Sequence, residues 1–376
     1  MKISQAIKVA GKPFEFKTNT VLKKPLVLVF GNRCLLEEST IYEEVRSLFV
    51  DGHIVFGSTA GEIIQEEVFD NSVVLTAIEF EKSSFLVRSK NMDDCEQNGT
   101  KLGLALMKEF PQKGLNYLFV VSEGSMVNGS NLIKGLETNK GKNIGLSGGL
   151  CGDDERFEKT VASYNQNPKK GEIVAIGFYG NDLEISSANF GGWTAFGPER
   201  TVTKSDGNLL YELDGQPALE LYRKYLGEKT KDLPQSALLF PLSVKSGRDE
   251  EPIVRTILNI DETNNAMILA GDVPLGSYVQ LMMSTIDDLV NGAKIAAEFA
   301  MRNRKTKPQL GILISCVGRK LVMDQRVEEE LEEVRAIIGQ NTAICGFYSY
   351  GEMAPFAGKE ACRLHNQTMT LTLFSE

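Results

Sequence analysis

Two short segments near opposite ends of the chain carry residue types that could bind a polar ligand. The first, Gly57-Ser58-Thr59-Ala60-Gly61-Glu62, follows the apolar run 54–56, and the second, Gly346-Phe347-Tyr348-Ser349-Tyr350-Gly351-Glu352, follows the run 343–345. Glycine lets a backbone turn sharply or approach a ligand closely. Hydroxyl groups and a carboxylate at such turns would bind a small polar molecule through hydrogen bonds. We therefore predict a ligand site built from both turns, through Ser58, Thr59, Gly61, Glu62, Tyr348, Tyr350 and Glu352.

Charged partners for such a ligand are also present. Arg319 follows Ser315-Cys316-Val317-Gly318 at a strand end, where a guanidinium can hold a carboxylate through two parallel hydrogen bonds. Its alternative partner is a glutamate of the following helix, which we interpret as a solvated face: Glu328, Glu329, Glu330, Glu332 and Glu333. Glu62 and Glu352 would receive an ammonium group or, alternatively, cap a helix N-terminus.

A serine hydrolase is a competing interpretation. Gly145-Leu146-Ser147-Gly148-Gly149 fits the G-x-S-x-G pattern, and His365 lies downstream. A nucleophile elbow needs a strand before the serine and a helix after it. The strand is expected, but residues 150–154 are turn-like, so the pattern predicts hydrolysis only weakly and we expect no enzyme.

Histidine is too scarce for a multi-histidine metal site, because the chain has only His53 and His365. His365, at the entrance of a strand, is either a structural histidine beside a polar turn or an axial haem ligand. A haem needs one histidine and an apolar slot. We expect no metal and no obligatory cofactor, with haem on His365 as the alternative.

The elements that must position these residues alternate between strands and helices. Strand-like runs occur at 26–30, 117–121 and 310–314, and the best helices at 285–302 and 328–338. Short gaps predict two antiparallel hairpins, 73–80 with 83–87 and 157–164 with 173–179.

The same order of strand, hydroxyl, helix, strand and glycine occurs twice, in residues 117–145 and again in residues 310–346. We predict a mixed α/β fold of two related modules, with partly antiparallel sheets flanked by helices, produced by an internal duplication. The segment Gly191 to Asp206 is rich in glycine at first and then polar, and it is the best candidate for the boundary between the two domains.

Composition excludes several classes of protein. The 376 residues are 42% apolar and 24% charged, with a net charge of −9, which argues against a nucleic-acid surface. No apolar run of about 18 residues is long enough for a membrane helix, and the N-terminus has no signal-peptide pattern. The six cysteines form no CxxC motif and are interpreted as reduced thiols. We therefore expect a cytoplasmic protein.

Several sequence segments together resemble those of the FIST sensory proteins. They are Gly57 to Glu62, the Gly148-Gly149 turn with Gly152-Asp153, the segment Tyr211 to Glu220 with Tyr222, Ser315 to Arg319, Gly346 to Glu352, and His365-Asn366-Gln367-Thr368. The resemblance covers nearly the whole chain, and implies an N-terminal FIST domain at 1–205 and a C-terminal FIST domain at 206–376.

The resemblance implies a ligand-binding sensor in signal transduction, for small molecules such as amino acids. Some relatives are haem-binding nitric oxide sensors that act on a histidine kinase. No kinase, cyclase or methyl-accepting segment is expected here, so the output would be a separate signalling protein such as a histidine kinase. A homodimer is left open.

Overall fold

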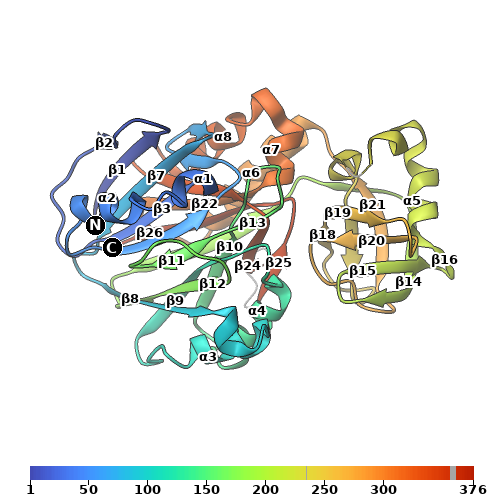
Figure 1. The fold of residues 1–376 in the computed structure, drawn as a ribbon, viewed down its shortest axis with the longest axis horizontal. Helices are drawn as coiled ribbons and strands as arrows, with labels where there is room; N and C mark the ends of the chain where they lie inside the picture. Colours follow the sequence, from blue (N-terminus) through green and yellow to red (C-terminus); the bar gives the residue numbers. More distant parts are fainter. Residues whose placement is uncertain (234, 356–360) are drawn as a thin grey trace.

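The computed structural model describes residues 1–233, 235–355 and 361–376. Three six-stranded sheets form one body, and a separate eight-stranded sheet lies to one side of it (Figure 1). Every sheet is mixed or antiparallel, and helices flank the sheets. This confirms the predicted mixed α/β fold.

The three sheets of the body are named here I, II and III. Sheet I has the order β11 (Ala162–Tyr164), β4 (His53–Ser58), β3 (Leu26–Gly31), β7 (Ser72–Glu79), β1 (Lys2–Val9) and β2 (Glu15–Thr18). Sheet II has the order β25 (Cys362–His365), β24 (Gly351–Pro355), β10 (Gly145–Leu150), β9 (Leu115–Ser122), β12 (Glu172–Tyr179) and β8 (Ser84–Asn91). Sheet III has the order β13 (Glu184–Phe190), β26 (Met369–Ser375), β22 (Leu310–Cys316), β23 (Ala343–Ser349), β5 (Glu62–Ile64) and β6 (Glu67–Phe69).

Each sheet contains the same four-stranded unit, in which a parallel pair continues into two antiparallel strands. The units are β4-β3-β7-β1, β10-β9-β12-β8 and β23-β22-β26-β13. A parallel pair needs a crossover connection, and helices supply it each time. The repeat predicted from the sequence corresponds to the units of sheets II and III, and the same unit also occurs in sheet I.

The units exchange edge strands in a closed cycle. The segment that follows each parallel pair leaves its own sheet: β5 pairs with β23 of sheet III, β24 pairs with β10 of sheet II, and β11 pairs with β4 of sheet I. Each sheet therefore needs a strand from another unit for its full width. The three units cannot separate without breaking main-chain hydrogen bonds.

Both predicted hairpins are wrong. β7 and β8 belong to sheets I and II, and the short link between them carries the chain from one sheet to the other. β11 pairs with β4, whereas β12 pairs with β8 and β9. A short gap between strands predicts pairing only when the chain stays within one sheet, and here the strands pack into a shared core instead.

Helices cover the outer faces of the sheets and leave the inner faces to form a common core. The helices are α1 (Arg33–Leu36), α2 (Ile41–Leu48), α3 (Gly99–Met107), α4 (Gly129–Thr138), α5 (Ala218–Leu226), α6 (Ile286–Met301), α7 (Val317–Met323) and α8 (Glu329–Ile338). Short 3-10 turns span Met92–Cys95, Gly227–Asp232, Gln235–Leu239 and Asp324–Arg326. Strands of all three sheets contribute to the central core, which includes Phe30, Phe119 and Phe347.

Local sequence explains where the main helices begin. Thr285 and Asp288 form a capping box at α6, each side chain bonding to the backbone of the other residue. The small residues Ala293, Ala296 and Ala300 recur at helical spacing and pack against sheet III. Asn128 caps α4 by accepting a hydrogen bond from the Asn131 N–H.

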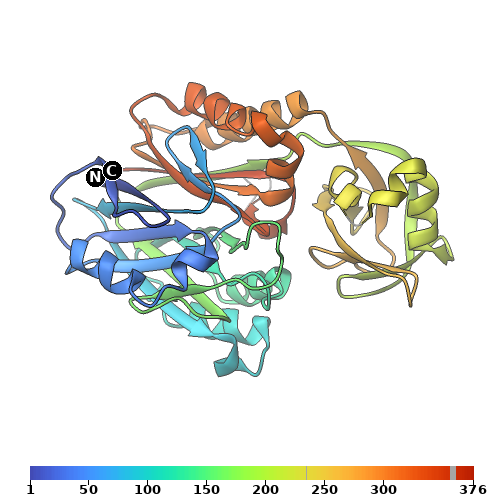
Figure 2. The ribbon, with the colours of Figure 1, turned by 45° about the horizontal axis from the view of Figure 1, so that its top comes forward.

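An inserted domain separates β13 from α6, and its colours in Figures 1 and 2 run from yellow-green to orange. It has its own apolar core, which packs α5 against the sheet. Its strand order is β18 (Ile253–Arg255), β17 (Leu242–Lys245), β21 (Tyr278–Met283), β14 (Thr194–Asp206), β15 (Leu209–Leu213), β20 (Ala266–Leu269) and β19 (Ile257–Asp261), with β16 (Gln216–Pro217) beside β15.

The chain passes from the body to the inserted domain before the domain boundary that the sequence predicts between residues 205 and 206. The chain leaves the body after β13, and the division falls at the end of β14. After the inserted domain, the chain returns to the body at α6 and completes sheet III (Figure 1).

Two further properties follow from the described part of the chain. Within residues 1–233, 235–355 and 361–376, helices that are both long and apolar enough to cross a bilayer do not occur. All six cysteines are free thiols, and four of them are buried.

A substitution of Gly346 would test how closely the parallel strands β22 and β23 approach each other in sheet III. A Cβ at this position would lie 1.8 Å from the Leu313 carbonyl oxygen of the neighbouring strand. Gly346→Ala is expected to lower the free energy of unfolding by about 1–3 kcal/mol, as overpacked cores do. Denaturant unfolding measures this.

The matched control is Gly247→Ala, where the nearest neighbour of the new Cβ would lie at an ordinary 3.6 Å. Equal stability of the two variants would contradict the close approach.

Candidate functional site

The two glycine turns predicted to bind a ligand do meet, but they bond to each other. The Ala60 N–H donates to the Tyr348 carbonyl at 2.8 Å, and the Tyr348 N–H donates to the Gly61 carbonyl at 2.9 Å. The Ser58 hydroxyl is buried and donates to the Gly152 carbonyl at 2.8 Å. These contacts fill the junction between the turns with protein hydrogen bonds. Ligand binding by Ser58, Thr59, Gly61 and Tyr348 stays a prediction.

Glu62 and Glu352 occupy equivalent, fully buried positions. The Thr59 hydroxyl donates to one oxygen of Glu62 at 2.5 Å, and the Ser72 hydroxyl donates to the other at 2.6 Å. Ser349 and Thr368 donate in the same way to Glu352, at 2.7 and 2.9 Å.

Both glutamates lie in strands, β5 and β24, so the helix-capping alternative is wrong. Burial raises the pKa of each carboxyl to about 8, although the hydroxyl donors act in the opposite direction. Both groups thus favour the neutral, protonated form near pH 7.

Arg319 is fully buried, and its charge is neutralised inside the protein. It donates to Glu330 at 2.7 Å, and Tyr348 donates to the same carboxylate at 2.7 Å. The alternative partner predicted for Arg319 is therefore the one observed. Glu330 is buried, so its assignment to a solvated helix face is wrong.

The same guanidinium holds both connections to the inserted domain. It donates to the carbonyl of Gly191, just after β13, at 2.5 Å, and to the carbonyl of Leu289 in α6 at 2.8 Å. Arg319 thus connects the outgoing and the returning chain to the body. Its proposed contact with a ligand carboxylate stays untested.

The residues of the hydrolase and haem alternatives are also buried. Ser147 pairs with the hydroxyl of Thr372 at 2.7 Å, in the core between sheets II and III. The Nε2 atom of His365 contacts the Ala354 carbonyl at 3.1 Å, and burial lowers the pKa of the ring to about 3. Haem binding by His365 stays a prediction, whereas Ser147 is fully buried and is not presented to a substrate.

A cavity of about 670 Å³ lies between the body and the inserted domain. Of the predicted site residues, Tyr350 lines this cavity. The body contributes Gly124, Ser125, Met126, Val127, Asn128, Gly129, Leu150, Phe157, Glu158, Tyr350 and Leu364, and the inserted domain contributes Asn208, Leu258, Asn259, Ile268, Leu269, Ala270 and Gly271.

The cavity walls expose large apolar side chains to solvent. Met126, Phe157 and Leu258 are each at least 40% exposed and all three line the cavity. Phe157 stacks on Tyr350 with ring centroids 4.6 Å apart and planes inclined by 18°. Apolar groups gathered in a concave space between domains are typical of small-molecule sites.

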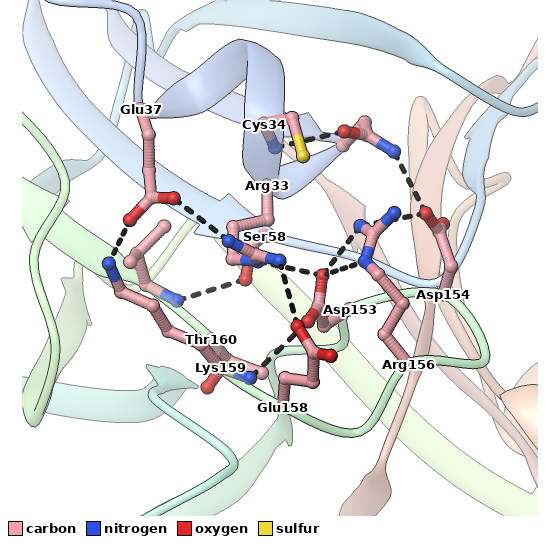
Figure 3. A network of polar contacts seen from close by, with 12 residues as sticks. Arg33, Cys34, Glu37, Ser58, Asp153, Asp154, Arg156, Glu158, Lys159 and Thr160 are labelled. Carbon is pink, nitrogen blue, oxygen red and sulfur yellow. Dashed lines mark hydrogen bonds and ion pairs between the residues drawn. The ribbon is translucent and has the colours of Figure 1, made fainter.

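The loop that carries Phe157 is anchored by the polar network in Figure 3. The buried Asp153 accepts hydrogen bonds from Arg33 at 2.8 Å and from Arg156 at 2.6 Å. Burial alone would raise the pKa of Asp153, but the hydrogen bonds from Arg156 and Arg33 outweigh it and lower the pKa. Lys159 pairs with Glu37, so both ends of the loop are tied to α1 and its C-terminus.

Hydrogen bonds next to the cavity join the two walls. Asn128 donates to Asp272 of the inserted domain at 3.1 Å, and Arg255 donates to the Leu364 carbonyl of the body at 2.9 Å. Arg255 is buried, and desolvation lowers its pKa to about 10. The walls are therefore positioned by directional contacts.

A second cavity, of about 620 Å³, borders Ala60 in the first glycine turn. Four of its charged side chains already pair with one another: Lys320 with Asp70, and Arg156 with Asp154 at 2.9 Å. A ligand there would have to break these pairs, so the interdomain cavity is the stronger candidate.

Sequence reasoning missed most of the interdomain cavity. Its lining comes from segments as distant as Gly124–Gly129 and residues 258–271, and only the fold brings them together. Tyr350 was found because it lies in a glycine-rich turn. An available signal was the Asn128-Gly129 helix start after a buried strand, since such loops often carry function.

The two buried glutamates generate a prediction about pH. Because their pKa of about 8 exceeds the usual value of 4.5, the folded protein binds protons more tightly than the unfolded chain between these values. The free energy of unfolding should fall as pH rises through this window, by up to about 1.4 kcal/mol per pH unit and glutamate. Glutamine mimics the neutral acid, so Glu62→Gln with Glu352→Gln should flatten this slope.

Denaturant unfolding at pH 5 and pH 8 measures the effect. The double variant should resemble the wild type at pH 5 and exceed it in stability at pH 8. Glu15→Gln, at an exposed position, is the control and should leave the slope unchanged. An unchanged slope in the double variant would contradict neutral glutamates.

Similar proteins occur in archaea and bacteria. An uncharacterized protein of Methanocaldococcus jannaschii is 26% identical over 260 residues, which cover 59% of this chain and 47% of that protein. An uncharacterized protein of Mycobacterium tuberculosis is 26% identical over 191 residues, or 49% of each chain, and one of Mycobacterium bovis is 23% identical over 181 residues, or 46% of each. The chain thus spans about half the length of the curated relatives it matches.

Family models match most of the chain. The FIST N domain matches residues 25–216, and the FIST C domain matches residues 218–355. FIST domains are associated with sensory signal transduction and are not a family of enzymes. The chain belongs to the FIST family.

Proposed function

We propose that this protein is a sensor that binds a small molecule in the cavity between the body and the inserted domain. The observation that supports the proposal is a cavity of about 670 Å³ with walls from both parts of the chain. This volume is in the range of small-molecule sites, which occur preferentially at domain interfaces.

Binding at this place would couple to the position of the inserted domain. A ligand that touches both walls interacts most strongly when the walls have one particular spacing, so it stabilises that arrangement over others. Only such a difference in affinity can shift a conformational equilibrium. The two chain connections held by Arg319 are the places about which the inserted domain would move.

The output and the location belong to the same proposal. We infer a separate signalling protein, such as a histidine kinase, as the receiver, and a cytoplasmic location. Both rest on the family's association with signal transduction and on the sequence.

Amino acids remain the ligand class implied by the family resemblance. The described residues that line the cavity include neither lysine nor arginine to hold an amino-acid carboxylate. Amino acids are therefore one part of a broader metabolite panel in the test.

Met126→Trp should abolish binding in this cavity. Met126 lines the cavity and is 46% exposed, so the bulkier indole ring of tryptophan at this position would occupy the space of the ligand. A thermal-shift screen should find compounds that stabilise the wild type and have no effect on Met126→Trp. Small-angle X-ray scattering should show that such a compound changes the radius of gyration of the wild type alone.

The matched control is Met283→Trp. Met283 is also 46% exposed, but it is outside the residues that line the cavity, so its variant should keep the response. Compounds that stabilise Met126→Trp as much as the wild type would show that they bind elsewhere, and a panel without any such compound would count against the sensor.

A further inference from the structure

We propose that the ligand is an uncharged molecule with a flat aromatic group that stacks on Phe157. This inference rests on the proposed function, because it names the chemical class of ligand for the same cavity. It is carried by the conformation of Phe157, by the charges of the cavity walls and by the amide side chains around them.

Phe157 is held in a conformation that a bulky residue rarely adopts. Its backbone φ is +52°, in the left-handed region that disfavours large side chains. Such strain persists where the surroundings impose it, often at ligand sites. Here the Phe157 N–H donates to the Tyr350 hydroxyl at 3.1 Å, and the ring stacks on Tyr350.

The Phe157 ring is therefore positioned before any ligand arrives. Tyr350 covers one of its faces, and Phe157 as a residue is still 41% exposed and lines the cavity. The network around Asp153 fixes the loop on the N-terminal side of Phe157 (Figure 3). A rigid, half-exposed aromatic ring favours a second flat ring, because aromatic pairs prefer offset-stacked or edge-to-face contacts.

The charges of the cavity walls favour a neutral ligand. Among the described residues that line the cavity, Glu158 is the only one with a charged side chain. It is 69% exposed and already pairs with Arg33 at 3.6 Å. A carboxylate ligand would enter the cavity without a cationic partner and would lose its hydration. A cationic ligand would have to compete with Arg33.

Amide side chains supply neutral hydrogen-bonding groups around the same space. Asn128, Asn208 and Asn259 all line the cavity, and each amide carries two donor hydrogens and an acceptor oxygen. Each already makes a hydrogen bond within the protein, Asn128 to Asp272, Asn208 to the Leu269 carbonyl and Asn259 from the Ile260 N–H, and each retains a second amide hydrogen or lone pair for a ligand. The inserted domain also contributes Leu258 and Ile268, which provide apolar contact. An aromatic ring with a carboxamide or a similar neutral polar group matches this combination.

Three small probes separate the features of this ligand class. Benzamide is flat and neutral, benzoate is flat and charged, and cyclohexanecarboxamide is neutral but not flat. Ligand-observed NMR titrations give the dissociation constant of each probe with the full-length protein. Benzamide should bind about two- to tenfold more tightly than cyclohexanecarboxamide, which is the range expected for an aromatic pair. It should also bind more tightly than benzoate, whose charge meets neither lysine nor arginine among the described residues that line the cavity.

Variants at Phe157 assign the preference to the ring. Phe157→Leu keeps an apolar side chain and should remove the preference for benzamide over cyclohexanecarboxamide, whereas Phe157→Tyr should retain it. Circular dichroism checks that both variants fold. If Phe157→Leu does not fold, the wild-type ranking of the three probes still decides the outcome.

The proposal is overturned if benzoate or cyclohexanecarboxamide binds as tightly as benzamide, or if folded Phe157→Leu keeps the preference. It is also overturned if benzamide does not bind while another compound binds in a manner that Met126→Trp abolishes. In that case the sensor function stands and only the ligand class is wrong. If neither the probes nor the metabolite panel bind, both proposals fail.

Discussion

The exchange of edge strands at the glycine turns is the constraint on which the rest of the structure depends. Each turn redirects the chain from the end of a parallel pair onto a neighbouring sheet, and the exchange closes in a cycle. The turns at 57–62 and 346–352 therefore lie close together, and main-chain hydrogen bonds of Ala60 and Gly61 with Tyr348 join them. Glu62 and Glu352 secure two of these turns through neighbouring hydroxyl groups.

Burial divides the polar residues of this protein into two groups. In the first group, charged and hydroxyl side chains are buried in the body and bond to other protein groups: Arg319 bonds to Glu330, and Ser147 bonds to Thr372. The walls of the interdomain cavity instead carry apolar and amide side chains. A charge stays buried only with a partner, so the charged groups stabilise the body, and the space left for a ligand is mostly uncharged.

The mixed α/β fold, the repeated unit and the FIST family were all predictable from the sequence. Apolar runs, glycine positions and short motifs can be recognised from residues that are neighbours in the sequence. The predicted hairpins failed because local spacing does not tell which sheet a strand joins: β7 and β8 are close in sequence yet lie in different sheets. The site was only partly predictable. Of the predicted ligand-binding residues, Tyr350 lines the candidate cavity, whereas Phe157 and Asn128 line it through segments that meet only in the folded chain.

The sequence by itself determined which segments form strands and helices, because hydrophobic periodicity and helix capping act over a few residues. It also shows which residue types could carry chemistry. Only the tertiary structure decided which of these face a cavity and which are buried in pairs, since burial depends on contacts between distant segments. Glu330 looks solvated in a run of glutamates, but the fold places it against Arg319 and Tyr348. Phe157, predicted in a strand over 157–164, lies instead in the loop before β11 and lines the cavity wall.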